Sequence, residues 1–450
     1  MEKRDFKEII ENFSYLAEVK DEAMIRNLIV DLHPADLADI LHHLDDEYRA
    51  YIFDMLDAEV ASDVMTELDE VSRDDILEDL DDKRIFEIVD EMDSDDATDF
   101  VSDLPSELAE KVLQQIDEQD SVEVKELLGH EEDTAGGIMA KEFVSVHQDS
   151  TIDEAIQEIR RKSEEVEDVY YVYVTDEDGK LVGIISLKDL ILSKPVMRVS
   201  HVMDKDVISV ETGLDQEEVA NIARRYDLVA IPVIDNQEKL VGRITFDDVA
   251  DVMEEEASED IQRMAGIADE EVRETSTFRI IKVRLPWLIV GFLGGIVAAF
   301  ILRNFEHSLN RVFAAAFFVP IIMAMGGNSG IQSSTIMVRG LATGEISLYH
   351  VGPRLMRELW VSILNGLICG FLILIIITFW LKNLNFGLVL AAAMIVVIIS
   401  ASVIGAVIPV VLKKLKIDPA IATGPFITTS NDVFGLLIYL ALITTFLQWI

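Results

Sequence analysis

The 450-residue chain contains one cysteine, Cys369, which lies in an apolar run. A disulfide framework is therefore excluded, and a small buried apolar side chain is the simplest interpretation of Cys369. The eight His are scattered without the spacing of metal ligands, and no P-loop, HExxH or nucleophile-elbow motif occurs. These absences argue against a redox protein, a zinc site and an enzyme.

Basic residues are also scarce, because 38 Lys and Arg accompany 83 Asp and Glu, for a formal net charge of −45. Nucleic acid is excluded as a partner, since phosphate binding needs clustered Lys and Arg. The N-terminal segment MEKRDFKEII lacks the apolar core of a signal peptide, so we expect the front of the chain to stay in the cytoplasm. Solubility alone is an alternative explanation of the acidic excess.

Acidic residues are nearly missing from the rear of the chain. Only five of the 83 follow residue 276, and twelve Lys and Arg accompany them: the acids are Glu306, Glu345, Glu358, Asp418 and Asp432. The sequence therefore predicts a strongly anionic, water-soluble part joined to a membrane-embedded part. It indicates cations as the partner.

Five apolar stretches follow Arg284, at about 286–302, 312–338, 359–381, 386–412 and 419–449. Each is long enough to span a bilayer, which takes roughly 17 to 25 residues. Pro and Gly interrupt the second and fifth, so we expect these two to be kinked or partly unwound. Nine Lys and Arg fall on one side and three on the other, namely Arg303, Arg311 and Lys382. This bias predicts a multi-pass protein of the cell membrane with a cytoplasmic N-terminus and an outside C-terminus.

Asp432 lies within the fifth stretch, where a carboxylate costs about 2.5 to 3.5 kcal/mol unless it meets water or a cation. No Lys, Arg or His lies inside the five stretches away from their ends, so we expect a transported cation to neutralise it. A protonated Asp hydrogen-bonded between helices is the alternative. Ligands that are all oxygen suit Mg²⁺ or Ca²⁺, and Mg²⁺ tends to keep its water. A symmetric dimer would place two Asp432 across one pore.

Residues 1–131 show short amphipathic segments with a repeated pattern, for example at 33–41, 56–65 and 92–101. The pattern predicts a small α-solenoid of helical hairpins. From residue 132 the pattern becomes strand, turn, strand, helix, given twice at an offset of 59 residues, with Gly183 and Gly242 in equivalent places. This duplication resembles a tandem pair of CBS motifs, at 132–199 and 200–252.

Each copy contains a Ser or Thr three residues before an Asp, in Ser186–Asp189 and Thr245–Asp248. A helix-capping box accounts for this spacing by itself. The resemblance to CBS motifs makes an adenine nucleotide such as ATP a candidate ligand, with Tyr170, Lys188 and Asp189 as candidate contacts. Residues 253–278 form an acidic connecting helix that could transmit movement to the membrane part, or a plain solvated linker.

The order of these parts, with the membrane motifs GGNSGxQSST and DPAxATGPFxTTSNDxxG, resembles the MgtE family of magnesium channels across essentially the whole chain. The resemblance implies a multi-domain fold: a cytoplasmic α-solenoid and α/β tandem CBS domains, followed by an α-helical five-span transmembrane domain at 279–450. It also implies a homodimeric, Mg²⁺-selective channel for uptake down the electrochemical gradient. Asp432 would select the ion, on a path lined near Gly326, Asn328, Thr335, Gly424 and Gly435.

The resemblance further implies that cytoplasmic Mg²⁺ holds the channel shut. The matching positions are Asp63, Asp95, Asp99, Asp215, Glu217, Asp227, Asp248, Asp251, Glu256, Glu259 and Asp260. Ile331 and Gly424 stand where some relatives have Asn, which bears on the finer selectivity contacts. The alternatives are a secondary transporter of Mg²⁺ or Co²⁺ coupled to Na⁺ or H⁺, a nucleotide-regulated membrane enzyme, and a front part that is only a scaffold.

Overall fold

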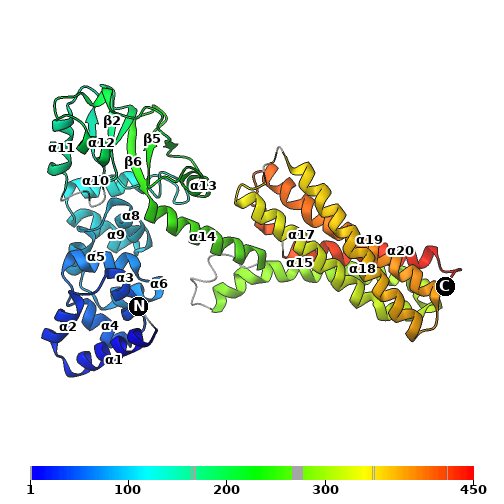
Figure 1. The fold of residues 1–450 in the computed structure, drawn as a ribbon. Coiled ribbons are helices and arrows are strands. Elements are labelled where there is room, and N and C mark those ends of the chain that lie inside the picture. Colours follow the sequence, from blue (N-terminus) through cyan, green and yellow to red (C-terminus); the bar gives the residue numbers. More distant parts are fainter. Residues whose placement is uncertain are drawn as a thin grey trace. The chain divides into compact units, whose positions relative to one another are not determined.

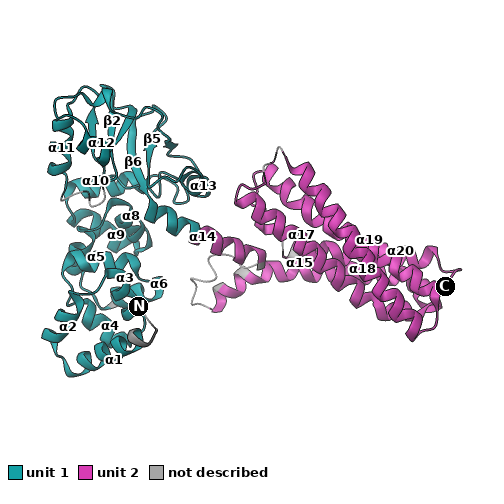
Figure 2. Cartoon of the chain, viewed as in Figure 1, with its two compact units in different colours: residues 1–253 teal, residues 254–450 magenta. Residues whose placement is uncertain are grey.

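The chain forms two compact units, residues 1–253 and 254–450, which are described separately (Figure 2). The structure is a computed structural model. It describes residues 3–163, 166, 169–265, 277–346, 348, 350–422 and 424–450.

The first unit begins with ten short helices (Figure 1). They are α1 (Lys3–Val19), α2 (Glu22–Ile29), α3 (Pro34–His42), α4 (Asp46–Phe53), α5 (Ala58–Glu67), α6 (Glu70–Asp79), α7 (Asp82–Val89), α8 (Ser94–Asp103), α9 (Ser106–Gln115) and α10 (Glu118–Leu127). Alternate helices pack on one another, α3 on α5, α5 on α7 and α7 on α9. They share one apolar core, which includes Ile52, Phe53 and Met65. The predicted α-solenoid is confirmed.

Many of the acidic residues in this solenoid begin its helices. The side chains of five N-cap residues accept a hydrogen bond from a backbone N–H of the first turn: Asp21, Asp57, Asp69, Asp81 and Asp117. An N-cap of this kind stabilises a helix by about 1 kcal/mol. Part of the acidic excess is therefore structural.

The rest of the first unit consists of two similar three-stranded sheets. The first copy contains β1 (Ser145–His147), α11 (Ile152–Arg161), β2 (Tyr171–Thr175), β3 (Leu181–Ser186) and α12 (Leu187–Leu192), and the second contains β4 (Val210–Glu211), α13 (Gln216–Tyr226), β5 (Ala230–Ile234), β6 (Leu240–Thr245) and the start of α14 (Phe246–Ala265). In each sheet the first strand is parallel to the second, which is antiparallel to the third.

Gly183 and Gly242 occupy equivalent places in the two copies. Each lies against a methionine side chain, Met203 for Gly183 and Met139 for Gly242. A Cβ at Gly183 would lie 2.7 Å from Met203 Sδ, and one at Gly242 would lie 2.7 Å from Met139 Sδ. The duplication read from the sequence is thus a duplication of packing as well as of pattern.

The second unit is helical. Its elements after α14 are α15 (Thr277–Asn304), α16 (Glu306–Arg311), the 3₁₀ helix η3 (Phe313–Phe318), α17 (Val319–Ala342), α18 (Val351–Trp380), α19 (Leu384–Lys414), the 3₁₀ turn η4 (Ala420–Ala422) and α20 (Pro425–Thr445). Five segments of the described chain are long and apolar enough to cross a membrane, one in each of α15, α18, α19 and α20 and one over η3 and α17. Helices α17, α18 and α20 pack on α19, and α15 packs on α20.

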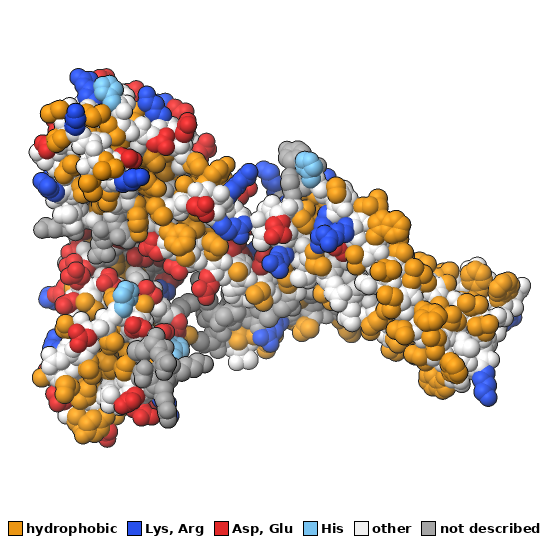
Figure 3. Space-filling model, viewed as in Figure 1, with side chains coloured by type: hydrophobic (Ala, Val, Ile, Leu, Met, Phe, Trp, Pro, Cys, Tyr) orange, Lys and Arg blue, Asp and Glu red, His pale blue; other side chains and the backbone are white. Residues whose placement is uncertain are grey.

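Exposed apolar side chains cover much of the visible surface of this unit (Figure 3). Such a surface suits lipid rather than water. The fold class predicted from the sequence is confirmed: a helical front part, two small α/β modules and five candidate membrane helices.

The described part of the second and fifth spans shows no break inside either α-helix, and the irregular backbone is limited to the segments before them. The second starts as the 3₁₀ helix η3, and the fifth is preceded by η4 and by Gly424, whose φ of −83° and ψ of −100° are not helical. Both polar motifs then continue into regular helix, so Gly326, Gly327 and Ser329 lie inside α17 without a break.

Candidate functional site

Asp432 lies in the third turn of α20 and is half-buried. Its neighbour Asn431 is 5% exposed and donates a hydrogen bond from Nδ2 to the Met323 carbonyl oxygen on α17, at 2.9 Å. This bond fixes α20 against α17 next to the carboxylate.

Gly326 and Gly435 are both buried against Asn431. A Cβ at Gly435 would lie 2.9 Å from Asn431 Oδ1, and one at Gly326 would collide with the same oxygen. The two glycines therefore provide room for the Asn431 amide where α17 and α20 approach closely. The sequence analysis did not predict a role for Asn431, because an Asn among the polar residues of TTSND does not show which of them packs against another helix.

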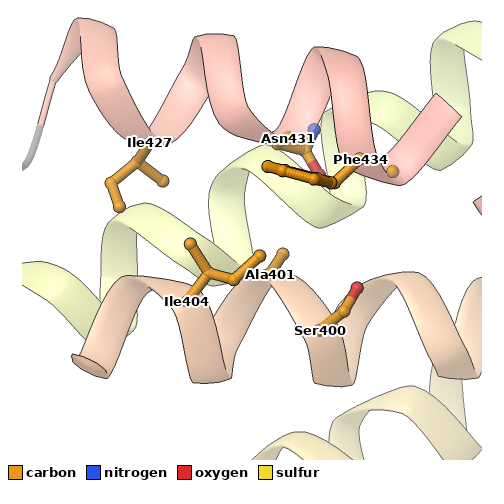
Figure 4. Close-up of a pocket in the computed structure, with 7 residues that line it drawn as sticks. Ser400, Ala401, Ile404, Ile427, Asn431 and Phe434 are labelled. Atoms are coloured by element: carbon orange, nitrogen blue, oxygen red, sulfur yellow. The ribbon is translucent and has the colours of Figure 1, made fainter. Parts of the chain in front are cut away.

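A small cavity lies beside Asn431, between α19 and α20. Ser400, Ala401 and Ile404 line it from α19, facing Ile427, Asn431 and Phe434 of α20 (Figure 4). Its volume is about 10 Å³, which is no more than one water molecule needs. A hydrated cation does not fit in this cavity.

The other predicted pore residues lie on α17 and at the start of α20. Asn328 is exposed and Thr335 is half-buried on α17, and Gly424 precedes α20 with its carbonyl oxygen accepting a 3.1 Å hydrogen bond from Thr428 Oγ1. Ile331, where some relatives have Asn, is 36% exposed on α17.

A second acid lies within the membrane-spanning helices, so Asp432 is not the lone acid that the sequence indicated. Helix α18 begins at Val351, eight residues before the apolar stretch read from the sequence, and so includes Glu358. Glu358 is 7% exposed and pairs with Arg354 at 3.3 Å, one turn earlier. Ser333 Oγ of α17 lies 3.4 Å from the carboxylate. The sequence analysis missed this acid because the apolar stretch begins at residue 359, one residue after Glu358, whereas the helix itself begins at Val351.

In the first unit, carboxylates from the solenoid and from the CBS pair meet in one place, here called the N–CBS acid cluster: Asp95, Asp96, Glu142 and Asp248. Ser94 donates from its backbone N and its Oγ to the Glu142 carboxylate, at 3.1 and 2.8 Å. Thr245 donates in the same two ways to Asp248 Oδ2, at 2.7 Å each. Glu142 is thus held in place by the start of α8, and Asp248 by the residue that comes three positions before it.

Desolvation and the charges of neighbouring carboxylates raise the pKa values of this cluster, and the Arg243 charge opposes the shift at Asp248. Burial and the charge of Asp248 raise the pKa of Asp95 well above its usual range. Desolvation by the surrounding protein and the same charge raise the pKa of Asp96 to about 7, although Asp96 is itself exposed. Burial and the charge of Asp93 raise the pKa of Glu142 to about 7. Burial also raises the pKa of Asp248, although the Thr245 hydrogen bonds oppose the shift. Proton or cation binding would relieve this repulsion.

The sequence predicted Asp95 and Asp248 but not Asp96 and Glu142. Asp96 follows Asp95 in the first turn of α8, and Glu142 lies in the loop before β1. Only the packing of α8 onto that loop brings Glu142 to the cluster. The sequence around Glu142 contains no pattern that predicts this contact.

Other predicted regulatory positions lie elsewhere in the first unit. Asp215 is the N-cap of the 11-residue helix α13 and Asp227 is its C-cap, in the left-handed region at φ 53°. Their backbone positions lie about 18 Å apart along the helix, so one ion cannot bind both carboxylates. The remaining positions are distributed over four helices, namely Asp63 on α5, Asp99 on α8, Glu217 on α13 and Asp251 on α14, and of these the charge of Asp99 adds to the raised pKa of Asp96.

In the second unit, the end of α14 carries charges that meet the segment before α20, here called the helix-end cluster: Glu259, Asp260, Arg263 and Asp418. Arg263 forms an ion pair with Glu259, and its Nη1 donates to Asp418 Oδ2 at 2.6 Å. Burial and the charge of Asp418, followed by that of Glu256, raise the pKa of Asp260 to about 6.

Two predicted positions, Glu259 and Asp260, thus lie in the helix-end cluster, and Glu256 acts on it through its charge. Arg263 was missed, although a cation in an acidic stretch is a visible signal. The predicted connecting segment continues to residue 278, and its positions 266–276 lie outside the described residues.

The candidate nucleotide contacts Tyr170, Lys188 and Asp189 are all exposed on the first CBS copy. Ser186 is the N-cap of α12, because its Oγ accepts from the Asp189 backbone N at 3.1 Å, and the same Oγ donates to Asp189 Oδ2 at 2.6 Å. The equivalent Asp248 of the second copy belongs to the N–CBS acid cluster, so the two copies differ in what their Asp faces.

Across the described residues, no group of three His, Cys, Asp or Glu is close enough to hold a metal ion as it stands. The N–CBS acid cluster nevertheless fits a hard divalent cation in its chemistry, because it consists of crowded carboxylates with raised pKa values.

Comparison with known proteins identifies the family. The profile described as "Divalent cation transporter", MgtE, matches residues 319–442, that of the MgtE intracellular N domain matches 32–133, and that of the CBS domain matches 135–194 and 199–255. The magnesium transporter MgtE of Thermus thermophilus is 38% identical over 328 residues, which cover 72% of this chain and 73% of that protein. This chain belongs to the MgtE family.

Two solved structures are similar to this chain, and the one with the higher TM-score agrees with the MgtE assignment. One, the soluble part of a magnesium transporter, is 31% identical, covers 56% of this chain and 99% of that one, and has a TM-score of 0.52. Another, the cytosolic domain of the Mg²⁺ channel MgtE in complex with ATP, is 35% identical over 50% of this chain and 93% of that one, with a TM-score of 0.48. The MgtE profile covers α17 to α20, and with them Asp432.

Proposed function

We propose that this chain forms a homodimeric, Mg²⁺-selective channel in the cell membrane, for uptake driven by the electrochemical gradient. The observation that carries the proposal is Asp432, a half-buried carboxylate in a membrane helix. No Lys, Arg or His forms an ion pair with it within the described part of the chain. A passing cation is the partner that would offset the cost of its charge.

The proposed dimer follows from the size of the space near Asp432. The cavity beside Asn431 holds about 10 Å³, and a hydrated ion needs more. A second copy across a twofold axis would supply a facing surface and a second Asp432. The N-terminus would be cytoplasmic and the C-terminus outside, as the distribution of Lys and Arg predicts.

Mg²⁺ is proposed over Ca²⁺ because the relatives are named as magnesium transporters. The path would run along α17 and α20, past Gly326, Asn328, Thr335, Gly424 and Gly435. Mg²⁺ tends to keep its water, so carboxylate and carbonyl oxygens would contact it through its hydration shell.

Closure by cytoplasmic Mg²⁺ is proposed at the two acid clusters. Desolvation, followed by the charges of neighbouring carboxylates, raises the pKa values of Asp95, Asp96 and Glu142, so the ionised forms of these groups are disfavoured. A divalent ion between them would allow the solenoid and the CBS pair to stay packed. Asp260 and Glu256 would respond in the same way beside Asp418. Several such sites acting together make a steep switch, because each adds its own preference for the closed state.

An adenine nucleotide, with ATP as the candidate, is proposed at the first CBS copy. Tyr170, Lys188 and Asp189 are exposed there and offer an aromatic face, a cation and a ribose acceptor. Asp248, the equivalent of Asp189, is engaged by Thr245 and the acid cluster, so the second copy is the poorer candidate.

Patch-clamp recording of reconstituted full-length protein, with internal Mg²⁺ as the variable, tests the proposal. We expect Mg²⁺ current that falls as internal Mg²⁺ rises, and Asp432→Ala should reduce it by at least about tenfold, equivalent to about 1.4 kcal/mol. Glu306→Gln, which removes an exposed acid of α16, is the matched control. Full current in Asp432→Ala would refute the pore assignment. Flux that follows an opposing Na⁺ or H⁺ gradient, without channel steps, would indicate a coupled transporter instead.

A further inference from the structure

A second and larger cavity lies at one end of the helical unit, where η3, the turn between α18 and α19 and the end of α20 meet. Its volume is about 590 Å³, which is within the usual range for a ligand site, roughly 300 to 1,000 Å³. The side chains that decide its chemistry are Arg311, Phe313, Leu381, Asn383 and Leu447.

This cavity lies at the level where the membrane spans end. The second span begins at Phe313, the third ends at Trp380, the fourth begins at Leu384 and the fifth ends at Thr445. Exposed aromatic side chains mark the same level, because Phe313 is 64%, Trp380 67% and Trp449 69% exposed. Such residues gather at the boundary between lipid tails and headgroups. A ligand here would have one end in each environment.

The cavity has one cationic side chain, and most of the residues that line it are apolar, although polar atoms make up more than half of the exposed wall. Arg311 has no acidic partner within 4.0 Å in the part of the chain that the structure describes. The Asn383 amide is already used, since its Oδ1 accepts from the Phe386 backbone N at 3.0 Å and its Nδ2 donates to the Ile450 carbonyl at 3.2 Å. Phe313, Leu381 and Leu447 supply apolar surface. The available chemistry is therefore a guanidinium and a polar wall at one side, with the apolar side chains of Phe313, Leu381 and Leu447 beside them.

We propose that this cavity binds an anionic phospholipid. The Arg311 guanidinium pairs with the lipid phosphate, as guanidinium groups do with phosphate through parallel N–H donors. The first methylene groups of an acyl chain lie against Phe313, Leu381 and Leu447. A lipid fits better than a second copy of the chain, since the position at the headgroup level brings phospholipid to the cavity at very high local concentration.

Binding of lipid to detergent-solubilised full-length protein tests this, measured by native mass spectrometry with dioleoyl phosphatidylglycerol as the probe. Phosphatidylcholine serves as the zwitterionic comparison, and glycerol 3-phosphate as the headgroup without tails. We expect phosphatidylglycerol to bind more tightly than either. Arg311→Gln should weaken its binding by about fivefold, the effect of one basic residue near an anionic membrane surface.

Arg303→Gln is the matched control, because Arg303 is an exposed cation in the last turn of α15, on the same side of the predicted membrane, and does not line the cavity. Its lipid binding should stay unchanged. Leu447→Trp, which fills the cavity and keeps Arg311, should weaken phosphatidylglycerol binding but not glycerol 3-phosphate binding. Equal weakening by Arg303→Gln, equal affinity for phosphatidylcholine, or a change in oligomeric mass with unchanged lipid binding would each overturn the proposal.

Discussion

Single residues at the α17–α20 contact explain why this region tolerates so little side-chain volume. The Asn431 amide fills the space that Gly326 and Gly435 leave open, and it reaches the Met323 carbonyl. Asp432 is the next residue along the chain, so the position of its carboxylate depends on this contact. The glycines of the motif therefore act through packing.

Gly326→Ala should destabilise the protein by about 1 to 3 kcal/mol, because the new methyl group collides with Asn431 Oδ1 in a tightly packed helix contact. Thermal unfolding of the full chain in detergent measures this. Gly327→Ala is the matched control, since a Cβ at Gly327 would meet only Asn431 Nδ2, at 3.7 Å. Equal losses in both variants would show that helix propensity, and not the Asn431 contact, sets the cost.

At the scale of single residues, the sequence predicts residues that are unusual for their surroundings, but not the residues that they contact in the fold. Asp432 is visible because a carboxylate is costly in an apolar run. Arg311 and Asn431 are unremarkable in type, and their importance comes from a cavity and a helix contact that the fold creates. Glu358 was placed outside the span because hydropathy marks where a span is apolar, and not where its helix begins.

Among the elements, helix α14 carries charges relevant to both clusters. Asp248 lies in its first turn, and Glu259, Asp260 and Arg263 lie near its end. At that end Arg263 already supplies a fixed cation to Glu259 and Asp418. Burial and the charges of Asp418 and Glu256 raise the pKa of Asp260 to about 6, against the opposing charge of Lys413, so Asp260 is the member of the helix-end cluster that we expect to attract a mobile cation.

Neutralising Glu256, Glu259 and Asp260 together should raise the internal Mg²⁺ concentration for half-closure by on the order of tenfold, equivalent to about 1.4 kcal/mol of lost binding energy. The reason is that the carboxylates proposed to attract Mg²⁺ beside Asp418 are removed. Patch-clamp recording over a series of internal Mg²⁺ concentrations measures the change. Glu254→Gln, an exposed acid of the same helix, should leave the curve in place. An unchanged curve in the triple variant would remove this end of α14 from the sensor.

Elements were predicted well where their signals are local. The solenoid helices begin at Asp N-caps, and the two CBS copies repeat at a fixed offset, so both were visible in the sequence. The N–CBS acid cluster was only half visible. Glu142 reaches it through the packing of α8 on a loop about fifty residues along the chain, a distance over which sequence spacing carries no information.

At the scale of the whole molecule, the acid cluster links stability to pH and to Mg²⁺. In the folded state Asp96 and Glu142 have pKa values of about 7, compared with 3.8 and 4.5 as ordinary values. Between about pH 4 and 7 the folded chain thus binds more protons than the unfolded chain, so stability falls as the pH rises through this window. Below this pH window both carboxyls are protonated and do not destabilise the folded chain. Above it they are ionised, and a bound cation would have to replace the protons.

We therefore expect the thermal midpoint of the first unit, followed in the full-length protein, to fall between about pH 4.5 and 7.5 without Mg²⁺. Added Mg²⁺ should restore on the order of 5 °C at the higher pH, where a kcal/mol shifts a unit of this size by about 2 to 4 °C. At the lower pH it should restore less, because protons already neutralise the cluster.

Asp96→Asn with Glu142→Gln should flatten the pH dependence and remove the Mg²⁺ effect, since amides neither titrate nor attract the ion. Asp189→Asn, on the first CBS copy and exposed, is the control that should keep both. Retention of the full Mg²⁺ effect in the double variant would mean that the ion stabilises the unit elsewhere. Loss of both effects would show that the N–CBS acid cluster causes the pH response and the proposed Mg²⁺ response. The same carboxylates would then bind either protons or Mg²⁺.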